Sequence, residues 1–185
     1  MGFLKPHTPS EYPSLLLYIL DETHITVTLT TAFAILWTRD AHVVWFAIGA
    51  LNSSLSAKVL KKFIRSPRPP PPPPTSSKPS SIRPKRTYGM PSTHSTALTF
   101  YFSYLLPLFP HLPYPLLVGP LITSYWIGGL WSRKELGYHT WEQIGVGAGF
   151  GAILAIAWRG VWEQCPIIGS TLQWLIDTTW RTMFG

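Results

Sequence analysis

Charged residues are scarce in this chain of 185 residues, and cysteine is almost absent. Asp, Glu, Lys and Arg together make up 12% of the sequence, about half the share found in typical soluble domains. The single cysteine, Cys165, excludes an intramolecular disulfide. The first residues lack an apolar core followed by a small-residue cleavage site, so we expect no removable signal peptide. The composition therefore argues against a soluble globular domain, whereas the cysteine count says nothing about the redox compartment.

Apolar and aromatic residues are abundant instead. Hydrophobic residues make up 46% of the chain, and it contains 9 tryptophans, which favour the boundary between membrane and water. Apolar stretches separated by short polar turns predict membrane spans at about residues 23–37, 41–61, 95–109, 116–131 and 140–158. The sequence thus predicts an all-α polytopic membrane protein built as a bundle of five to six helices.

The length of the chain predicts one domain of ordinary size. We expect residues 1–22 to be an N-terminal segment carrying a short interfacial helix, and residues 23–185 to be one membrane helical domain. Within that domain, residues 66–90 form a basic loop rich in proline. The run Pro69–Pro74 has no backbone donors and favours an extended polyproline path. Residues 165–185 have amphipathic spacing, which fits a last partial span or an interfacial helix.

Positive charge is concentrated in one interval of the chain. The net charge is +7, and nine lysines and arginines fall between residues 58 and 86, where there is no acidic residue. Nucleic acid, anionic lipid headgroups or a phosphorylated substrate would each explain such a cluster. We expect no nucleic acid, because the cluster is attached to membrane helices and shows no nucleic-acid-binding motif. The positive-inside rule would place this interval in the cytosol.

The polar residues able to carry out chemistry gather in three stretches, "KKFIRSPRP", "MPSTHS" and "SRKELGYHTWEQ". The candidate residues in them are Lys61, Arg68, Ser92, Thr93, His94, Arg133, His139 and Gln143. If the spans from residue 41 to residue 158 all cross the bilayer, the loops bearing these stretches lie on the same side. We therefore expect one site at one membrane face.

In order and spacing, the three stretches resemble the signature of the type 2 phosphatidic acid phosphatase superfamily. That signature is Lys-x6-Arg-Pro, then Pro-Ser-Gly-His, then Ser-Arg-x5-His-x3-Asp, and the resemblance covers about residues 41–158. Thr93 stands where glycine is usual, and Gln143 stands where the final aspartate is expected. The longer strings "YGMPSTHS" and "YHTWEQ" are similar to the dolichyl pyrophosphate phosphatase branch of that superfamily.

This resemblance implies hydrolysis of a dolichyl or polyprenyl diphosphate to the monophosphate plus phosphate, without a metal or any other cofactor. It implies an integral protein of the endoplasmic reticulum whose active site faces the lumen. It also implies that His139 attacks phosphorus to form a phosphohistidine, and that His94 protonates the leaving group and then activates water. The phosphate-binding residues that it implies are Lys61, Arg68, Ser92, Thr93 and Arg133.

The residue types suit this reaction. Phosphoryl transfer depends mostly on positioning and on neutralising charge, which fixed cations do well. Ser92 and the backbone amides of Thr93 and His94, at the start of a span, would form an anion-binding nest. Gln143 follows His139 by one helical turn, so its amide oxygen can accept a hydrogen bond from the imidazole and fix the tautomer.

Simpler interpretations exist for several of these features. Lys61 at the end of a span would by itself be expected to extend its ammonium group to the interface. The string "GVGAGFGA" at residues 145–152 resembles a nucleotide loop only superficially, and small residues that let helices approach closely explain it better. A metal site at His139 and Glu142 lacks a matching ligand set. The proline run is expected to be a stiff spacer rather than a ligand for an SH3 or WW module.

Other functions remain open from sequence alone. The same chemistry could act on shorter prenyl diphosphates such as the farnesyl or geranylgeranyl compounds, or on another lipid phosphate such as phosphatidate. A catalytically silent lipid-binding or scaffold protein is the alternative from a different class. The chain keeps both candidate histidines and all three candidate cations, which argues against a silent protein. These residues are His94, His139, Lys61, Arg68 and Arg133.

Overall fold

The computed structural model describes residues 9–70 and 87–184. In these residues it contains seven α-helices, two short 3-10 helices and no strand, which confirms the all-α prediction. The helices are η1 (Pro9–Glu11), α1 (Leu15–Asp21), α2 (Thr23–Thr38), α3 (Ala41–Ile64), α4 (Thr93–Leu105), η2 (Leu106–His111), α5 (Pro115–Glu135), α6 (Trp141–Gln164) and α7 (Pro166–Phe184).

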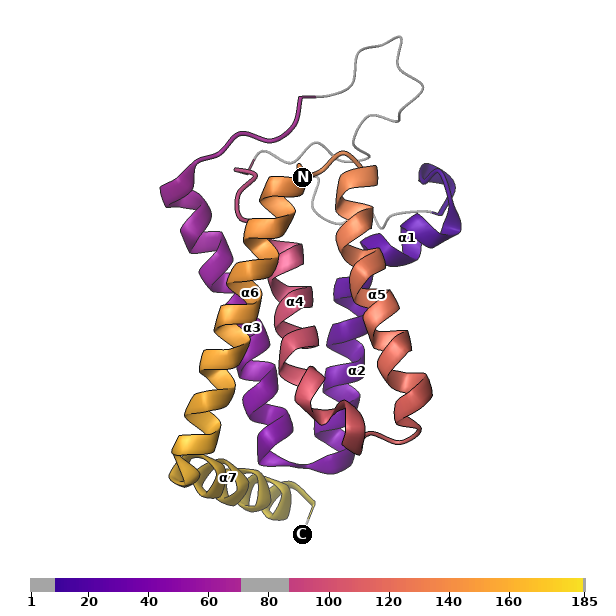
Figure 1. Ribbon diagram of the computed structural model, residues 1–185. Coiled ribbons are helices and arrows are strands. Elements are labelled where there is room, and N and C mark those ends of the chain that lie inside the picture. Colours follow the sequence, from indigo (N-terminus) through magenta and orange to yellow (C-terminus); the bar gives the residue numbers. More distant parts are fainter. Residues whose placement is uncertain (1–8, 71–86, 185) are drawn as a thin grey trace.

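Helices α2 to α6 stand side by side, whereas α7 lies across one end of this bundle and α1 flanks α5 near the other end (Figure 1). Helices α3 and α6 are each long and apolar enough to cross a membrane. A third span is present if α1 and α2, which meet at an angle of 56°, are counted together. The protein is an integral, polytopic all-α membrane protein.

Helix α4 is shorter than the predicted span and lies at the centre of the bundle. It has 13 residues, of which six are buried, and it packs against α3, α5 and α6. Its polar side chains bond inside the protein: Thr96 Oγ1 donates to the carbonyl of Ser92, and Thr99 Oγ1 accepts from the indole of Trp126. With 13 residues α4 is too short to cross a membrane by itself, and its polar side chains bond inside the bundle rather than facing lipid.

Helices α4 and α6 approach closely because two glycines of α6 face α4. A Cβ atom at Gly151 would overlap the carbonyl oxygen of Thr96, and one at Gly147 would lie 2.7 Å from the carbonyl oxygen of Ser92. Gly149, on another face of α6, has open space around its Cβ position. Small residues thus bring the start of α4, with its candidate site residues, against α6.

We expect Gly151→Ala to destabilise the protein and Gly149→Ala to leave it unchanged or slightly stabilised. The added methyl group at residue 151 must push two helices apart, a cost of about 1–3 kcal/mol, whereas at residue 149 only the better helix propensity of alanine counts. Thermal unfolding of both variants in the same detergent measures the difference. Equal melting temperatures would show that the glycines do not determine the helix spacing.

The opposite end of the bundle is held by aromatic contacts and by α7. The rings of Trp45 and Trp158 stack with centroids 4.3 Å apart, and each indole N–H donates to the backbone carbonyl of the other residue. In α7, Gln173 bonds the backbone of Arg39 and Ala41, where α2 turns into α3. The domain boundaries predicted from sequence stay predictions, and most of the proline-rich loop lies outside the described residues.

Candidate active site

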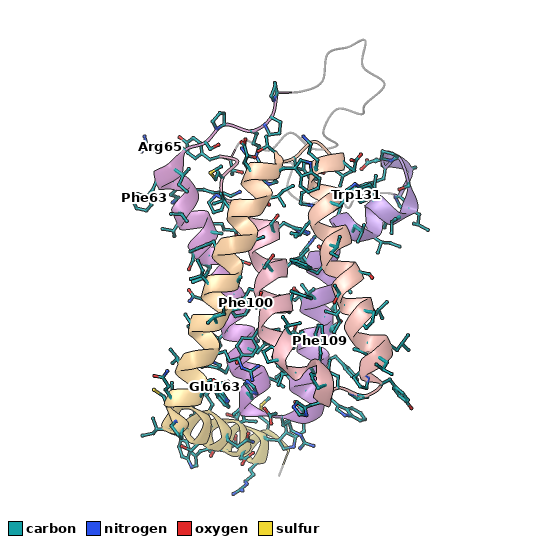
Figure 2. All side chains as sticks on the ribbon, viewed as in Figure 1. Phe63, Arg65, Phe100, Phe109, Trp131 and Glu163 are labelled. Atoms are coloured by element: carbon teal, nitrogen blue, oxygen red, sulfur yellow. The ribbon has the colours of Figure 1, made fainter. Side chains whose placement is uncertain are left out.

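The three stretches with candidate residues meet at one end of the bundle. Figure 1 places the end of α3, the start of α4 and the connection between α5 and α6 at the same end. In Figure 2, Arg65 and Trp131 lie at this end, and Glu163 lies at the other. This arrangement is the one that the alternation of spans predicts.

Arg68, in the first stretch, uses its guanidinium group to contact the third stretch and Thr87, which lies just before the second. Helix α3 ends where Arg65 takes a left-handed conformation with φ of 52°, and residues 66–70 continue without regular secondary structure. The Nε atom of Arg68 donates to the carbonyl of Thr87 at 2.8 Å, and Nη2 donates to the Thr87 hydroxyl at 3.0 Å. Its Nη1 atom donates to the carbonyl of Tyr138 at 2.8 Å. Arg68 is therefore fixed in place on several sides.

The imidazole of His139 is buried between Arg68 and Gln143. Its Nε2 atom lies 3.3 Å from Nη1 of Arg68, and its Nδ1 atom lies 3.1 Å from Oε1 of Gln143. The amide of Gln143 is oriented by a third contact, since its Nε2 donates to the carbonyl of Pro67 at 2.7 Å. The Gln143 oxygen must then face His139, so Nδ1 carries the hydrogen and Nε2 keeps its lone pair.

Gln143 also starts helix α6. The Thr140 hydroxyl accepts from the backbone N–H of Gln143, and Oε1 of Gln143 accepts from the backbone N–H of Thr140 at 3.4 Å. This reciprocal pair is a capping box, which fixes the beginning of a helix. The Thr-x-x-Gln spacing was visible in the sequence and could have predicted it. One side chain thus both caps α6 and orients the imidazole.

The surroundings of His139 favour its neutral form. Its pKa is lowered to about 3, first by burial and then by the positive charges of Arg68 and Lys61. Arg133 lowers the pKa further, and only the hydrogen bond with Gln143 acts in the other direction. The Lys61 side chain itself is buried in the last turn of α3. A neutral imidazole whose Nε2 carries no hydrogen is the form in which histidine acts as a nucleophile.

Ser92 acts as the N-cap of α4. Its hydroxyl oxygen accepts from the backbone N–H and from the hydroxyl of Ser95, and its own backbone N–H donates to the carbonyl of Gln143 at 3.1 Å. Ser92 is fully buried, and Thr93, the first residue of α4, is half-buried. The Ser92 hydroxyl, for which phosphate binding is predicted, thus already caps α4. It lies beside a helix N-terminus, which attracts anions.

His94 makes contact with α2. Its Nε2 atom lies 2.7 Å from the hydroxyl of Thr23, which is completely buried. His94 also lines a cavity of about 260 Å³ between α2, α3 and α4. Sequence reasoning missed Thr23, because a threonine at the start of a span carries no signal by itself.

Arg133 is buried and paired with an acid. Its Nη1 atom lies 2.7 Å from Oδ1 of Asp21, at the end of α1. Sequence reasoning missed Asp21, although an ionisable residue at the end of an apolar run is a signal for function in membrane proteins.

The structure therefore brings His139, Arg68 and Gln143 into direct contact, and it places Lys61 and Arg133 where their charges act on His139. Ser92, the N-cap of α4, contacts Gln143 through its backbone N–H, and His94 lies in the first turn of the same helix. The roles predicted for all these residues stay predictions. Within residues 9–70 and 87–184 there is no group of three or more histidine, cysteine, aspartate or glutamate side chains placed to hold a metal ion.

The model of the PAP2 superfamily matches residues 42–165, which include all three stretches. The chain belongs to the PAP2 superfamily.

Curated relatives agree with this assignment. The chain is 31% identical to Dolichyldiphosphatase 1 of Dictyostelium discoideum over 75% of this chain and 60% of that protein. It is 30% identical to Dolichyldiphosphatase 1 of Mus musculus over 92% of this chain and 76% of that protein. The alignment with the human Dolichyldiphosphatase 1 covers 67% of this chain and 54% of that protein, at 31% identity. The chain thus spans less than two thirds of the Dictyostelium and human proteins, and no solved structure matches it.

Proposed function

We propose that this protein hydrolyses a dolichyl or polyprenyl diphosphate to the monophosphate plus inorganic phosphate. The observation that carries the proposal is the arrangement of His139, with Gln143 on Nδ1 and the guanidinium of Arg68 at Nε2. A nucleophile whose lone pair points at a fixed cation suits attack on a phosphoryl group, because the cation binds the phosphoryl oxygens. Membership of the superfamily and the names of the relatives support the substrate class.

The reaction would proceed in two steps. The Nε2 lone pair of His139 forms a bond to the terminal phosphorus, and the bond from that phosphorus to the bridging oxygen breaks. The leaving polyprenyl monophosphate takes a proton from His94. Water then gives a proton back to His94 and attacks the phosphohistidine, which releases phosphate and restores the neutral imidazole.

The cavity between α2, α3 and α4 supports a lipid substrate. His94 and Thr23 lie at its end near the site, and Ile35 and Ala47 belong to its lining farther along the helices. From Thr23 to Ile35 an α-helix rises by about 18 Å. Among the candidate site residues His94 lines this cavity, so a chain of isoprene units can lie along its largely apolar wall with the diphosphate directed to the His94 end.

Phosphate release from a panel of lipids tests the proposal. The panel contains dolichyl and farnesyl diphosphates, their monophosphates and phosphatidate, each in detergent with EDTA. We expect the long-chain diphosphates to be hydrolysed fastest and EDTA to have no effect. Equal rates on the monophosphates would contradict the assignment as a diphosphatase. A preference for farnesyl diphosphate would favour the shorter substrates. No phosphate release from any lipid would favour a silent lipid-binding protein.

We further propose that the protein resides in the endoplasmic reticulum with this site facing the lumen. The resemblance to the dolichyl pyrophosphate phosphatase branch supports the placement, whereas the positive-inside rule would put the basic residues near the site in the cytosol. Lys61 and Arg68 weigh little in that rule, because their charges surround His139. Modification of the exposed Lys62 by a membrane-impermeant reagent, in sealed vesicles and in opened ones, decides the orientation.

We expect Gln143→Glu to move the acid limb of kcat/KM to higher pH. In the natural protein the pKa of His139 is lowered to about 3, so protonation of the nucleophile does not limit the rate at pH 5. A carboxylate beside Nδ1 would stabilise the imidazolium and raise this pKa, so a growing fraction of the nucleophile is protonated as the pH falls. Rates on the preferred diphosphate between about pH 4 and pH 8 measure the shift. Identical profiles for the two proteins would show that residue 143 does not control the protonation of His139.

A further inference from the structure

Asp21 is a buried acid that the reaction steps above do not use. It is the last residue of α1, and its side chain is 8% exposed. One carboxylate oxygen lies 2.7 Å from Nη1 of Arg133. The other accepts from the hydroxyl of Tyr12 at 2.5 Å and from the hydroxyl of Tyr138 at 3.3 Å. An acid buried at the membrane boundary is costly unless it is paired, and here both of its oxygens have partners.

The guanidinium of Arg133 is held on two sides. Its Nε and Nη2 atoms donate to the hydroxyl of Ser132 on its own helix, and Nη2 also donates to the carbonyl of Leu20 in α1. With Nη1 bound to Asp21, one hydrogen of that nitrogen is left for another acceptor. A phosphate oxygen is the acceptor that the predicted role of Arg133 requires.

The same residues connect directly to the nucleophile. The backbone carbonyl of Arg133 accepts from the N–H groups of both Tyr138 and His139, at 3.1 Å and 3.2 Å. Asp21 therefore contacts the side chains of two residues, Arg133 and Tyr138, whose backbones hold His139. Asp21 thus links the end of α1 to the guanidinium of Arg133 and to the segment that carries His139.

We propose that Asp21 is a positioning residue that fixes the guanidinium of Arg133 for phosphate binding, which makes α1 part of the active site. The proposal rests on the proposed function, because it takes Arg133 to bind the phosphate of the substrate. Asp21 itself touches neither the substrate nor the reacting atoms. Its contribution is to order a long side chain before the substrate arrives, so that binding does not have to order it.

Asp21→Asn tests the proposal, with Glu22→Gln as the matched control on the neighbouring acid. The asparagine keeps the shape of the side chain and removes the charge that holds Arg133. We expect kcat/KM on dolichyl diphosphate to fall by about 10- to 100-fold, as expected for a misplaced binding group. We also expect the thermal stabilisation that inorganic phosphate gives the natural protein to be lost. Glu22→Gln should match the natural protein in both measurements.

A double-mutant cycle separates positioning from simple damage to the fold. In an Arg133→Gln background, Asp21→Asn should lower kcat/KM by less than about threefold, because its effect acts through Arg133. Full additivity of the two substitutions would overturn the proposal. So would a single Asp21→Asn variant that binds phosphate and turns over substrate like the natural protein.

If the Asp21→Asn protein does not fold, Tyr12→Phe tests whether Asp21 positions Arg133. This change removes only the hydroxyl that holds one oxygen of Asp21 and keeps the charge. We expect a loss of about threefold or more in kcat/KM and weaker stabilisation by phosphate, and no change in either would overturn the proposal. Phosphate binding is measured without a lipid, so a natural protein that hydrolyses no lipid would refute the proposed function and still leave the role of Asp21 testable.

Discussion

We expect replacement of His139 with asparagine to abolish release of phosphate from dolichyl diphosphate, with a loss of about 10⁴-fold or more, because the proposed covalent nucleophile is removed. The asparagine amide keeps a donor for Oε1 of Gln143 but has no basic nitrogen at the position of Nε2 to attack phosphorus. The start of α6 should therefore stay intact, since Thr140 and Gln143 still form the capping box. Initial rates and thermal unfolding, measured on the same preparation, separate a chemical loss from a loss of fold.

His111→Asn is the matched control for this substitution. His111 is exposed in η2, and we expect the variant to keep the full rate. If the His139→Asn protein keeps more than about a tenth of the natural rate while folded, another group is the nucleophile.

A second large effect is expected for His94→Asn, which should trap the covalent intermediate. In the proposed reaction, His94 protonates the leaving monophosphate and later activates water. A phosphate monoester is a good leaving group and needs little help from an acid, whereas water needs a base to attack. The first step should therefore survive better than the second. We expect steady-state turnover to fall by about 10²- to 10⁴-fold while labelled phosphate accumulates on the enzyme.

The measurement uses substrate labelled in the terminal phosphate and a rapid quench. The His94→Asn protein should retain close to one label per active enzyme, and the His139→Asn protein should retain none. A His94→Asn protein that turns over normally would assign the acid and base to another residue. One that neither turns over nor binds label would show that His94 is already essential in the first step.

Much of the site could be predicted from the sequence because its residues fall at helix ends. Lys61 lies in the last turn of α3, His94 in the first turn of α4, and His139 just before α6, so the alternation of spans puts all three at one end of the bundle. The glycines that pack α6 against α4 were also visible, as a string of small residues in an apolar segment.

Other features depend on contacts that no local pattern encodes. Asp21 lies 112 positions before Arg133, and nothing near either residue in the chain indicates that they pair. The Pro67 carbonyl that orients Gln143 is a backbone atom, which carries no signal in a sequence. The sequence extended the span at α4 to residue 109, whereas α4 ends at Leu105 and the chain continues as η2, where Pro107 and Pro110 have no backbone donor.

The position of the phosphate on the trapped enzyme tests the central claim most directly. Mass spectrometry of the labelled peptide identifies the residue, and ³¹P NMR of the quenched protein distinguishes the two ring nitrogens. Because Nδ1 of His139 is bound to Gln143, the phosphate is predicted on Nε2 of His139. Phosphate on Nδ1, on another residue or on no residue at all would contradict the arrangement on which the proposed function depends.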